Sequence, residues 1–149
     1  MIRQAKPTVR TILLVEDNPA DVRLIEVALS SADAPVRFTV APDGAAALRA
    51  LHNDGEYADA PRPDLVLLDL NVPVISGREV LAALKGDDAL RSIPVIVMTS
   101  SNAPADIDYC YQIGTNGYVN KPIDLDGYLR VVRSVADFWL SVAELPGVA

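Results

Sequence analysis

The segment Leu65-Val-Leu-Leu68, followed directly by Asp69, shows the pattern that decides the fold. Four consecutive apolar residues at strand length are typical of a strand that is buried on both faces of a parallel sheet. Two further runs have the same form, namely Thr11-Ile-Leu-Leu-Val15 before Glu16-Asp17 and Ile93-Pro-Val-Ile-Val-Met98 before Thr99. We therefore expect a parallel sheet whose central strands end in polar residues.

Segments with apolar residues at three- and four-residue steps separate these runs and two weaker strand candidates, at 36–40 and 117–119. The helical segments are 19–30, 44–52, 76–84, 104–113 and 126–143. Each is long enough to cross from one parallel strand to the next. Five strands that alternate with five helices predict an α/β fold, with helices on both faces of a doubly wound parallel sheet and a long last helix.

Length, charge and cysteine content restrict the class of protein. The 149 residues fit one domain, which we expect at 11–149 behind an N-terminal tail at 1–10. The net charge of −7 opposes nucleic-acid binding, since phosphate contacts need a basic surface. No apolar run is long enough to span a membrane, and the N-terminus is too polar for a signal peptide. A lone cysteine, Cys110, excludes an intrachain disulfide, so we expect a cytoplasmic protein.

Polar side chains follow the predicted strands. Ligands of open parallel sheets bind beyond the carboxyl ends of the strands, and here those ends carry Glu16, Asp17, Asp69, Thr99 and Lys121. Three carboxylates drawn together repel one another unless a cation neutralises them, and oxygen ligands suit a hard divalent ion such as Mg²⁺. With the lysine and a hydroxyl donor, the site would stabilise a phosphoryl group. Asp69 would then be the nucleophile that forms an aspartyl phosphate.

Each of these residues also has an ordinary structural explanation. Acidic pairs and Thr99-Ser100 can cap helices, Asp69 can solvate the end of a strand, and Lys121-Pro122 can form a surface turn. The coincidence of these residues at four strand ends favours a functional site.

His52 and Cys110 have no partners at ligand spacing, so we expect a surface histidine and a packed thiol.

The motifs resemble those of the receiver domains of two-component response regulators, over residues 11–143. The resemblance rests on Glu16-Asp17, on Asp69-Leu-Asn-Val-Pro73 followed by Gly77, on Thr99-Ser100, and on Gly117-Tyr-Val-Asn-Lys-Pro122. It implies a flavodoxin-like fold and phosphoryl transfer from the phosphohistidine of a sensor histidine kinase. It also implies a switch that catalyses only its own phosphorylation and dephosphorylation, without a turnover product.

The resemblance implies a set of magnesium ligands. Asp17 and Asp69 would bind Mg²⁺ directly, together with the backbone carbonyl of Asn71, and Glu16 would act through water. Glu16 departs from the family pattern, because aspartate is common at this position.

The resemblance also implies how the phosphoryl group is sensed. Thr99 and Lys121 would contact its oxygens, and Thr99 and Tyr118 would form the conformational switch. The peptide bond between Lys121 and Pro122 would be cis. Ile123 stands where phenylalanine is common.

Three further features resemble the stand-alone receivers that serve phytochrome-type sensor kinases. They are Val15-Glu-Asp-Asn-Pro-Ala-Asp21, the long loop before Pro63-Asp64, and Phe138-Trp139-Leu140. Apart from Glu16-Asp17, these features lie outside the expected chemistry of the site, so they indicate the partner and not the reaction.

The last helix carries two apolar stripes, although a helix on a sheet surface needs only one. The second stripe comprises Tyr128, Val131, Val135, Phe138 and Val142, with Trp139 beside it. We expect this stripe to form a homodimer interface with the fourth helix and fifth strand. The alternative is that residues 1–10 fold over it.

Three other functions remain open from the residues. One is a receiver-like interaction scaffold that is never phosphorylated. A second is a magnesium phosphatase of the haloacid-dehalogenase type, but that class needs an aspartate where Asn71 stands, and a cap domain. A third is a flavin carrier, in which the acidic Glu16-Asp17-Asn-Pro19 segment would repel the cofactor phosphate.

Overall fold

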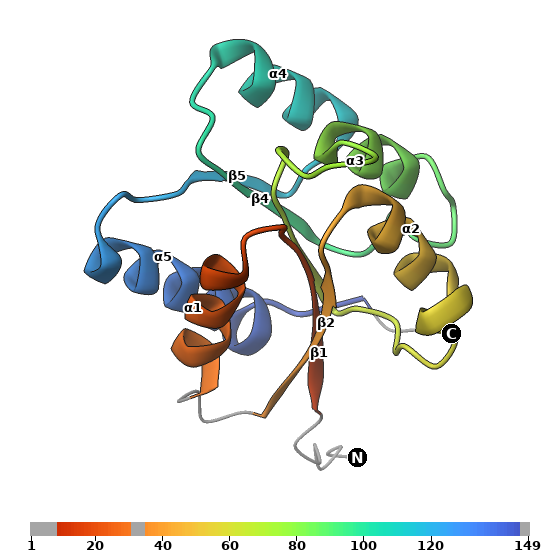
Figure 1. Ribbon diagram of the computed structural model, residues 1–149, viewed down its shortest axis with the longest axis horizontal. Helices are drawn as coiled ribbons and strands as arrows, with labels where there is room; N and C mark the ends of the chain where they lie inside the picture. Colours follow the sequence, from red (N-terminus) through yellow and green to blue (C-terminus); the bar gives the residue numbers. More distant parts are fainter. Residues whose placement is uncertain (1–8, 31–34, 147–149) are drawn as a thin grey trace.

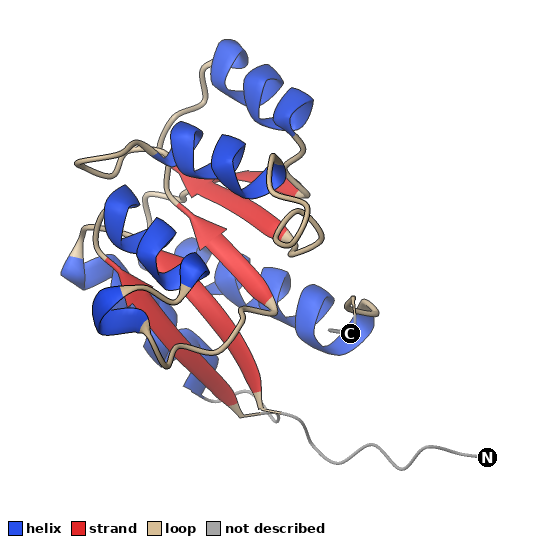
Figure 2. Cartoon of the chain, turned by 90° about the vertical axis from the view of Figure 1, so that its right-hand side faces the viewer, coloured by secondary structure: helices blue, strands red, loops and turns tan. Residues whose placement is uncertain are grey.

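A five-stranded parallel sheet forms the centre of the protein (Figures 1 and 2). The computed structural model describes residues 9–30 and 35–146. The strands are β1 (Arg10–Val15), β2 (Val36–Ala41), β3 (Leu65–Leu68), β4 (Val95–Thr99) and β5 (Gly117–Asn120). Their order across the sheet is β2-β1-β3-β4-β5, and every neighbouring pair is parallel. This doubly wound order confirms the expected fold class.

Helices cover both faces of the sheet, as Figure 1 shows. The α-helices are α1 (Pro19–Ser30), α2 (Gly44–His52), α3 (Gly77–Lys85), α4 (Pro104–Ile113) and α5 (Leu125–Asp137). A short 3₁₀ turn, η1 (Gly55–Tyr57), follows α2, and a π-helical turn, η2 (Phe138–Val142), continues α5. Helices α1 and α5 pack on one face, and α2, α3 and α4 pack on the other.

Two hydrophobic cores lie on the two faces of the sheet. Alternate residues of β1 point to opposite cores, with Leu13 and Val15 in the core under α2–α4 and Ile12 and Leu14 in the core under α1 and α5. Every residue of β3 and β4 is buried. This burial on both faces explains why the central strands are continuous apolar runs in the sequence.

Most predicted boundaries agree with the structure to within two residues, and the differences have local causes. Strand β4 starts at Val95 and not at Ile93, because Pro94 has no N–H for the ladder. Ser76 caps α3 instead of starting it, and its Oγ accepts a hydrogen bond from the Glu79 N–H at 3.3 Å. Helix α5 starts at Leu125 behind the capping carboxylate of Asp124.

The loop from β3 to α3 packs tightly against its surroundings. The N–H of Gly77 donates to the carbonyl oxygen of Leu70 at 3.0 Å. A Cβ atom on Gly77 would overlap the carbonyl oxygen of Asp69. Only glycine lets the start of α3 approach the backbone of Asp69 so closely.

Candidate functional site

The register of the sheet brings three carboxylates together. Val15 pairs with Leu68 at the ends of β1 and β3, and the Asp69 N–H donates to the Val15 carbonyl at 3.0 Å. Oxygens of Glu16, Asp17 and Asp69 consequently lie within 4.8 Å of one another. Glu16 and Asp69 are buried, whereas Asp17 is exposed. This set of oxygen donors fits a hard divalent cation, and these are the three carboxylates that the sequence predicts to meet.

Lys121 closes the site from the other side. The backbone N–H of Lys121 donates to the Thr99 carbonyl at 2.8 Å, which places the residue beside the end of β4. Its Nζ atom donates to Glu16 Oε2 at 2.7 Å, to Asp69 Oδ2 at 2.8 Å and to Asp21 Oδ2 at 3.0 Å. An ammonium group has three N–H donors, so these three carboxylates use all of them.

Asp21 is a site residue that the sequence argument missed. It lies in the first turn of α1, and its carboxylate points to Lys121. No local pattern in the sequence marks Asp21, because its partner Lys121 is 100 positions away in the chain.

Burial and the lysine act in opposite directions on the two buried carboxylates. Burial raises the pKa of Glu16 to about 7, although the hydrogen bond from Lys121 counteracts part of this shift. Burial also disfavours ionised Asp69, but hydrogen bonds from Lys121 and from the Asn71 N–H outweigh it and lower the pKa of Asp69. The same ion pairs outweigh the burial of Lys121 and raise its pKa. Without metal, Glu16 therefore takes up a proton more readily than Asp69.

The raised pKa of Glu16 should make the affinity for Mg²⁺ depend on pH. This pKa of about 7 lies above the ordinary 4.5, so below about pH 7 the metal-free folded protein keeps a proton there that a divalent cation must displace. We expect Mg²⁺ affinity to fall by up to about tenfold per pH unit below pH 7. Calorimetric titrations at about pH 6 and about pH 8 measure this, with Glu16→Gln as the control that removes most of the dependence. Equal affinity at both pH values in the unmodified protein would contradict the prediction.

The loop after β4 connects the two predicted switch residues. Thr99 is fully buried, and its Oγ1 accepts a hydrogen bond from the Ser101 N–H at 3.4 Å. The Tyr118 hydroxyl donates to the Ser101 carbonyl at 2.8 Å, and Asn120 Nδ2 donates to the same oxygen at 2.8 Å. Asp106 on α4 accepts from Ser101 Oγ at 2.6 Å. The structure thus links Thr99 and Tyr118 through the backbone of Ser101.

Comparison with known proteins agrees with this geometry. The family model for the response regulator receiver domain matches residues 12–133. The chain belongs to the response regulator receiver family. Response regulators act in two-component signalling, and their receiver domains interact with sensor kinases. This membership sets aside the phosphatase and the flavin carrier.

Similar receivers are found in bacteria and archaea. Response regulator Rcp1 of Synechocystis is 40% identical over 137 residues, which cover 92% of this chain and 93% of Rcp1. The probable methanogenesis regulatory protein FilR2 of Methanothrix harundinacea is 38% identical and covers 93% of this chain and 88% of FilR2.

Solved structures of receivers superpose closely. The phosphorylated cyanobacterial phytochrome response regulator RcpA has a TM-score of 0.91 at 44% identity, covering 94% of this chain and all of RcpA. The Mn²⁺-bound form of Rcp1 has a TM-score of 0.89 at 40% identity, covering 93% of this chain and 99% of Rcp1.

Three local expectations for this receiver can now be compared with the structure. The peptide bond between Lys121 and Pro122 is trans, so the expected cis bond is wrong; the trans form is intrinsically favoured, and Lys121 reaches its carboxylates from it. His52 is exposed and Cys110 is fully buried, as expected. Burial also raises the pKa of the Cys110 thiol. The backbone N–H of Asn71 donates to Asp69 Oδ1 at 3.0 Å.

Part of the second apolar stripe of α5, which the sequence predicts as a dimer interface, is buried inside the protein. Tyr128 is 5% exposed and belongs to the core, so its placement on an outer face is wrong. Its hydroxyl has no partner among the residues that the structure describes. Val131, Val135 and Trp139 are partly buried because α5 packs against α1 as well as against the sheet.

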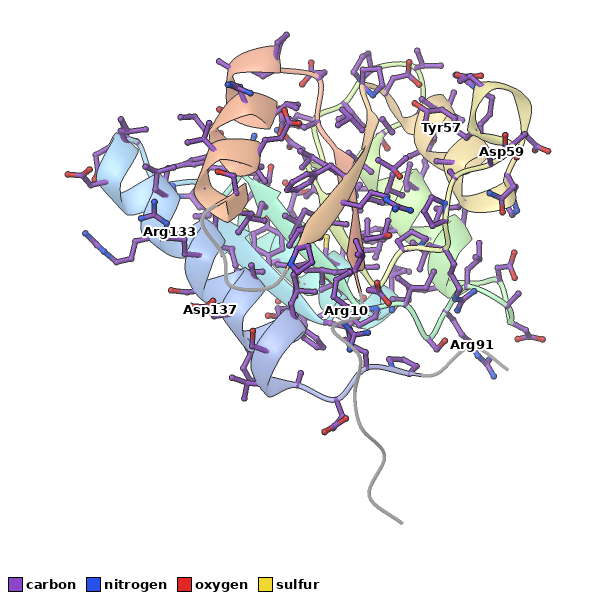
Figure 3. The ribbon with its side chains drawn as sticks, turned by 90° about the horizontal axis from the view of Figure 1, so that it is seen from below. Arg10, Tyr57, Asp59, Arg91, Arg133 and Asp137 are labelled. Carbon is purple, nitrogen blue, oxygen red and sulfur yellow. The ribbon has the colours of Figure 1, made fainter. Side chains whose placement is uncertain are left out.

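The π-helical turn η2 exposes apolar side chains. Phe138 is 51% exposed and Val142 is 70% exposed, and the Phe138 ring meets Trp139 edge-on at 5.3 Å. Arg133 and Asp137 lie on the exposed side of α5 (Figure 3). The expected continuous α-helix to residue 143 instead ends at Asp137 and changes to π-helical turns.

Within residues 9–30 and 35–146, no helix has the length and apolar character needed to cross a bilayer.

Proposed function

We propose that this receiver accepts a phosphoryl group from the phosphohistidine of a sensor histidine kinase onto Asp69, in a reaction that requires Mg²⁺. The observation that carries the proposal is the contact of Lys121 Nζ with Asp69 Oδ2 at 2.8 Å, beside two further carboxylates at cation-binding distance. A buried carboxylate that is kept ionised by a lysine is a nucleophile paired with its own anion-stabilising group. The proposal includes a cytoplasmic location and a single receiver unit at residues 11–149.

The chemistry is a displacement at phosphorus. An oxygen of Asp69 forms the new P–O bond, the P–N bond of the phosphohistidine breaks, and the imidazole leaves with its electron pair. Lys121 neutralises negative charge on the phosphoryl oxygens, and the hydroxyl of Thr99 donates a hydrogen bond to one of them. Bound Mg²⁺ would supply further positive charge to these oxygens. The residues that would hold it are Asp17, Asp69 and the Asn71 carbonyl, with Glu16 acting through water.

The signal leaves the site through the loop after β4. Movement of Thr99 toward the phosphoryl group would pull on the Ser101 backbone, which Tyr118 and Asn120 hold by hydrogen bonds. The surface around α4 and β5 would change with it, and a partner would detect that change.

Incubation with acetyl phosphate and Mg²⁺, followed by intact-mass measurement, tests the proposal. We expect one phosphoryl adduct on the unmodified protein and none on Asp69→Asn. Asp59→Asn, which alters an exposed aspartate outside the site, is the matched control and should carry the adduct. Absence of the adduct from the unmodified protein would favour the scaffold that is never phosphorylated.

We further propose that the donor is a phytochrome-type sensor kinase. RcpA is a cyanobacterial phytochrome response regulator, and this chain resembles it along nearly its whole length. Phosphotransfer from a purified phytochrome kinase should be faster than transfer from an unrelated histidine kinase at equal concentration. Equal rates from the two kinases would contradict this assignment.

We also propose a homodimer through the apolar surface of η2 and the end of α5. This surface is formed by Phe138, Trp139 and Val142 with the edges of Val131 and Val135. The support is the exposure of Phe138 and Val142, which lie one helical turn apart on the described surface. Dimerisation would place both side chains in an apolar environment. The alternative cover is the segment 1–10, of which residues 1–8 lie outside the described residues.

Light scattering tests the dimer with the double variant Phe138→Asp, Val142→Asp, which we expect to be monomeric. Val74→Asp is the control, because Val74 is also exposed but follows β3 at the opposite end of the sheet. An unchanged dimer mass in the double variant would refute this interface.

A further inference from the structure

Lys121 has one partner that the proposed chemistry does not use. Its ammonium group contacts Glu16 and Asp69, which belong to the carboxylate cluster, and also Asp21 on α1 at 3.0 Å. The Lys121 side chain is 10% exposed and that of Asp21 is 22% exposed. This contact is therefore largely shielded from water and joins residues 100 positions apart in the chain.

The position of Asp21 is not explained by capping of α1. A carboxylate in the first turn of a helix often serves the unpaired backbone N–H groups there. In this helix Asn18 performs that task, since its Oδ1 accepts from the Ala20 N–H at 2.9 Å. The Asn18 N–H in turn donates to Glu16 Oε1 at 3.1 Å. The start of α1 is capped without Asp21, and the Asp21 carboxylate is directed to the lysine.

Asp21 also lies outside the carboxylate cluster that could hold a cation. That cluster consists of Glu16, Asp17 and Asp69. When Glu16 and Asp69 turn their oxygens to a divalent ion, they become weaker partners for the lysine, because the ion and the ammonium group repel each other. Asp21 is then the carboxylate outside the cluster that still attracts Lys121.

We propose that Asp21 is a positioning residue, which keeps the ammonium group of Lys121 beside Asp69 while the other carboxylates bind the cation. The inference rests on the proposed phosphorylation of Asp69. Asp21 does not touch the reacting atoms; it fixes the lysine that does. With Asp21 in place, one N–H of Lys121 stays anchored and the other two are free to meet phosphoryl oxygens.

The test compares phosphorylation rates of Asp21→Asn, Asp21→Glu and the unmodified protein with acetyl phosphate. Rates are measured by intact mass at concentrations of Mg²⁺ and acetyl phosphate that saturate each variant separately, so that a change in affinity does not enter. We expect the maximal rate of Asp21→Asn to fall about tenfold, the effect of losing one charge-assisted hydrogen bond that orients the lysine. Asp21→Glu keeps the carboxylate and should recover most of the rate.

Asp126→Asn is the matched control. Asp126 is an exposed carboxylate in the first turn of α5, so the variant loses the same charge from the first turn of a helix. Its maximal rate should equal that of the unmodified protein.

The possible outcomes separate the inference from the proposed function. An Asp21→Asn rate equal to that of the unmodified protein, or an Asp21→Glu rate as low as that of Asp21→Asn, overturns the positioning role and leaves phosphorylation of Asp69 standing. Failure of the unmodified protein to form an adduct overturns both. A purely structural role of Asp21 would lower the unfolding free energy without lowering the maximal rate of the folded protein, and this result also overturns the inference.

Discussion

Replacement of Lys121 by methionine is expected to slow phosphorylation of the protein by acetyl phosphate at least about a hundredfold, because a preorganised charged donor at the reacting oxygens is lost. The variant should also be less stable. It leaves Glu16 and Asp69 buried without their cation, and breaking a buried ion pair costs about 3 to 5 kcal/mol. Glu16 relieves part of this cost by taking up a proton, so we expect about 3 kcal/mol near neutral pH.

Urea unfolding with and without Mg²⁺ measures the stability effect of Lys121→Met. Mg²⁺ should restore more stability to this variant than to the unmodified protein, since it replaces the missing positive charge. Lys85→Met is the control, because Lys85 Nζ also meets three acceptors, but these are neutral oxygens of Arg91, Ile93 and Asn116. That variant should also lose stability, yet gain nothing extra from Mg²⁺ and keep its phosphorylation rate. Equal effects of Mg²⁺ on both lysine variants would contradict the prediction.

Gly77→Ala is expected to destabilise the protein strongly, although it adds only one methyl group. The new Cβ would overlap the carbonyl oxygen of Asp69 and lie 2.6 Å from the Leu70 Cα, so rigid backbone would have to move. We expect a loss of about 3 kcal/mol or more of unfolding free energy, in the range that marks a steric conflict in a packed region. Because the displaced backbone is that of Asp69, the adduct should also form much more slowly.

Thermal and urea unfolding measure the effect of Gly77→Ala against Gly86→Ala, at the other end of α3. Gly86 has a right-handed backbone with φ of −85°, and its nearest contact is the Ala82 carbonyl at 3.0 Å. We expect Gly86→Ala to change stability by less than about 1 kcal/mol. The steric argument would be wrong if the two variants were equally stable.

The central strands could be predicted from sequence because a strand buried on both faces is apolar at every position. Leu65–Leu68 is apolar throughout, and the structure buries every one of its side chains. The carboxylate cluster was predictable for a related reason. Parallel strands end at one edge of the sheet, so Glu16, Asp17 and Asp69 had to meet once the strands were identified.

Features that depend on packing between distant elements could not be predicted in this way. The apolar stripe of α5 looked like an outer surface, but α1 covers part of it and buries Tyr128. Asp21 looked like one more acidic residue in a helix, and only the three-dimensional position of Lys121 gives it a partner. The π-helical turns at Phe138–Val142 left no pattern in the sequence that separates them from an α-helix.

The Ser101 carbonyl oxygen, which accepts hydrogen bonds from both Tyr118 and Asn120, has a consequence for how the loop after β4 responds. Both donors come from β5, where they lie on the same side of the strand, and a shift of the loop weakens both bonds together. A loop that moved only part of the way would weaken both bonds, so we expect intermediate positions to be disfavoured. If the proposed switch acts through this loop, its response would have a threshold, and small thermal displacements would not reach a partner as a false signal.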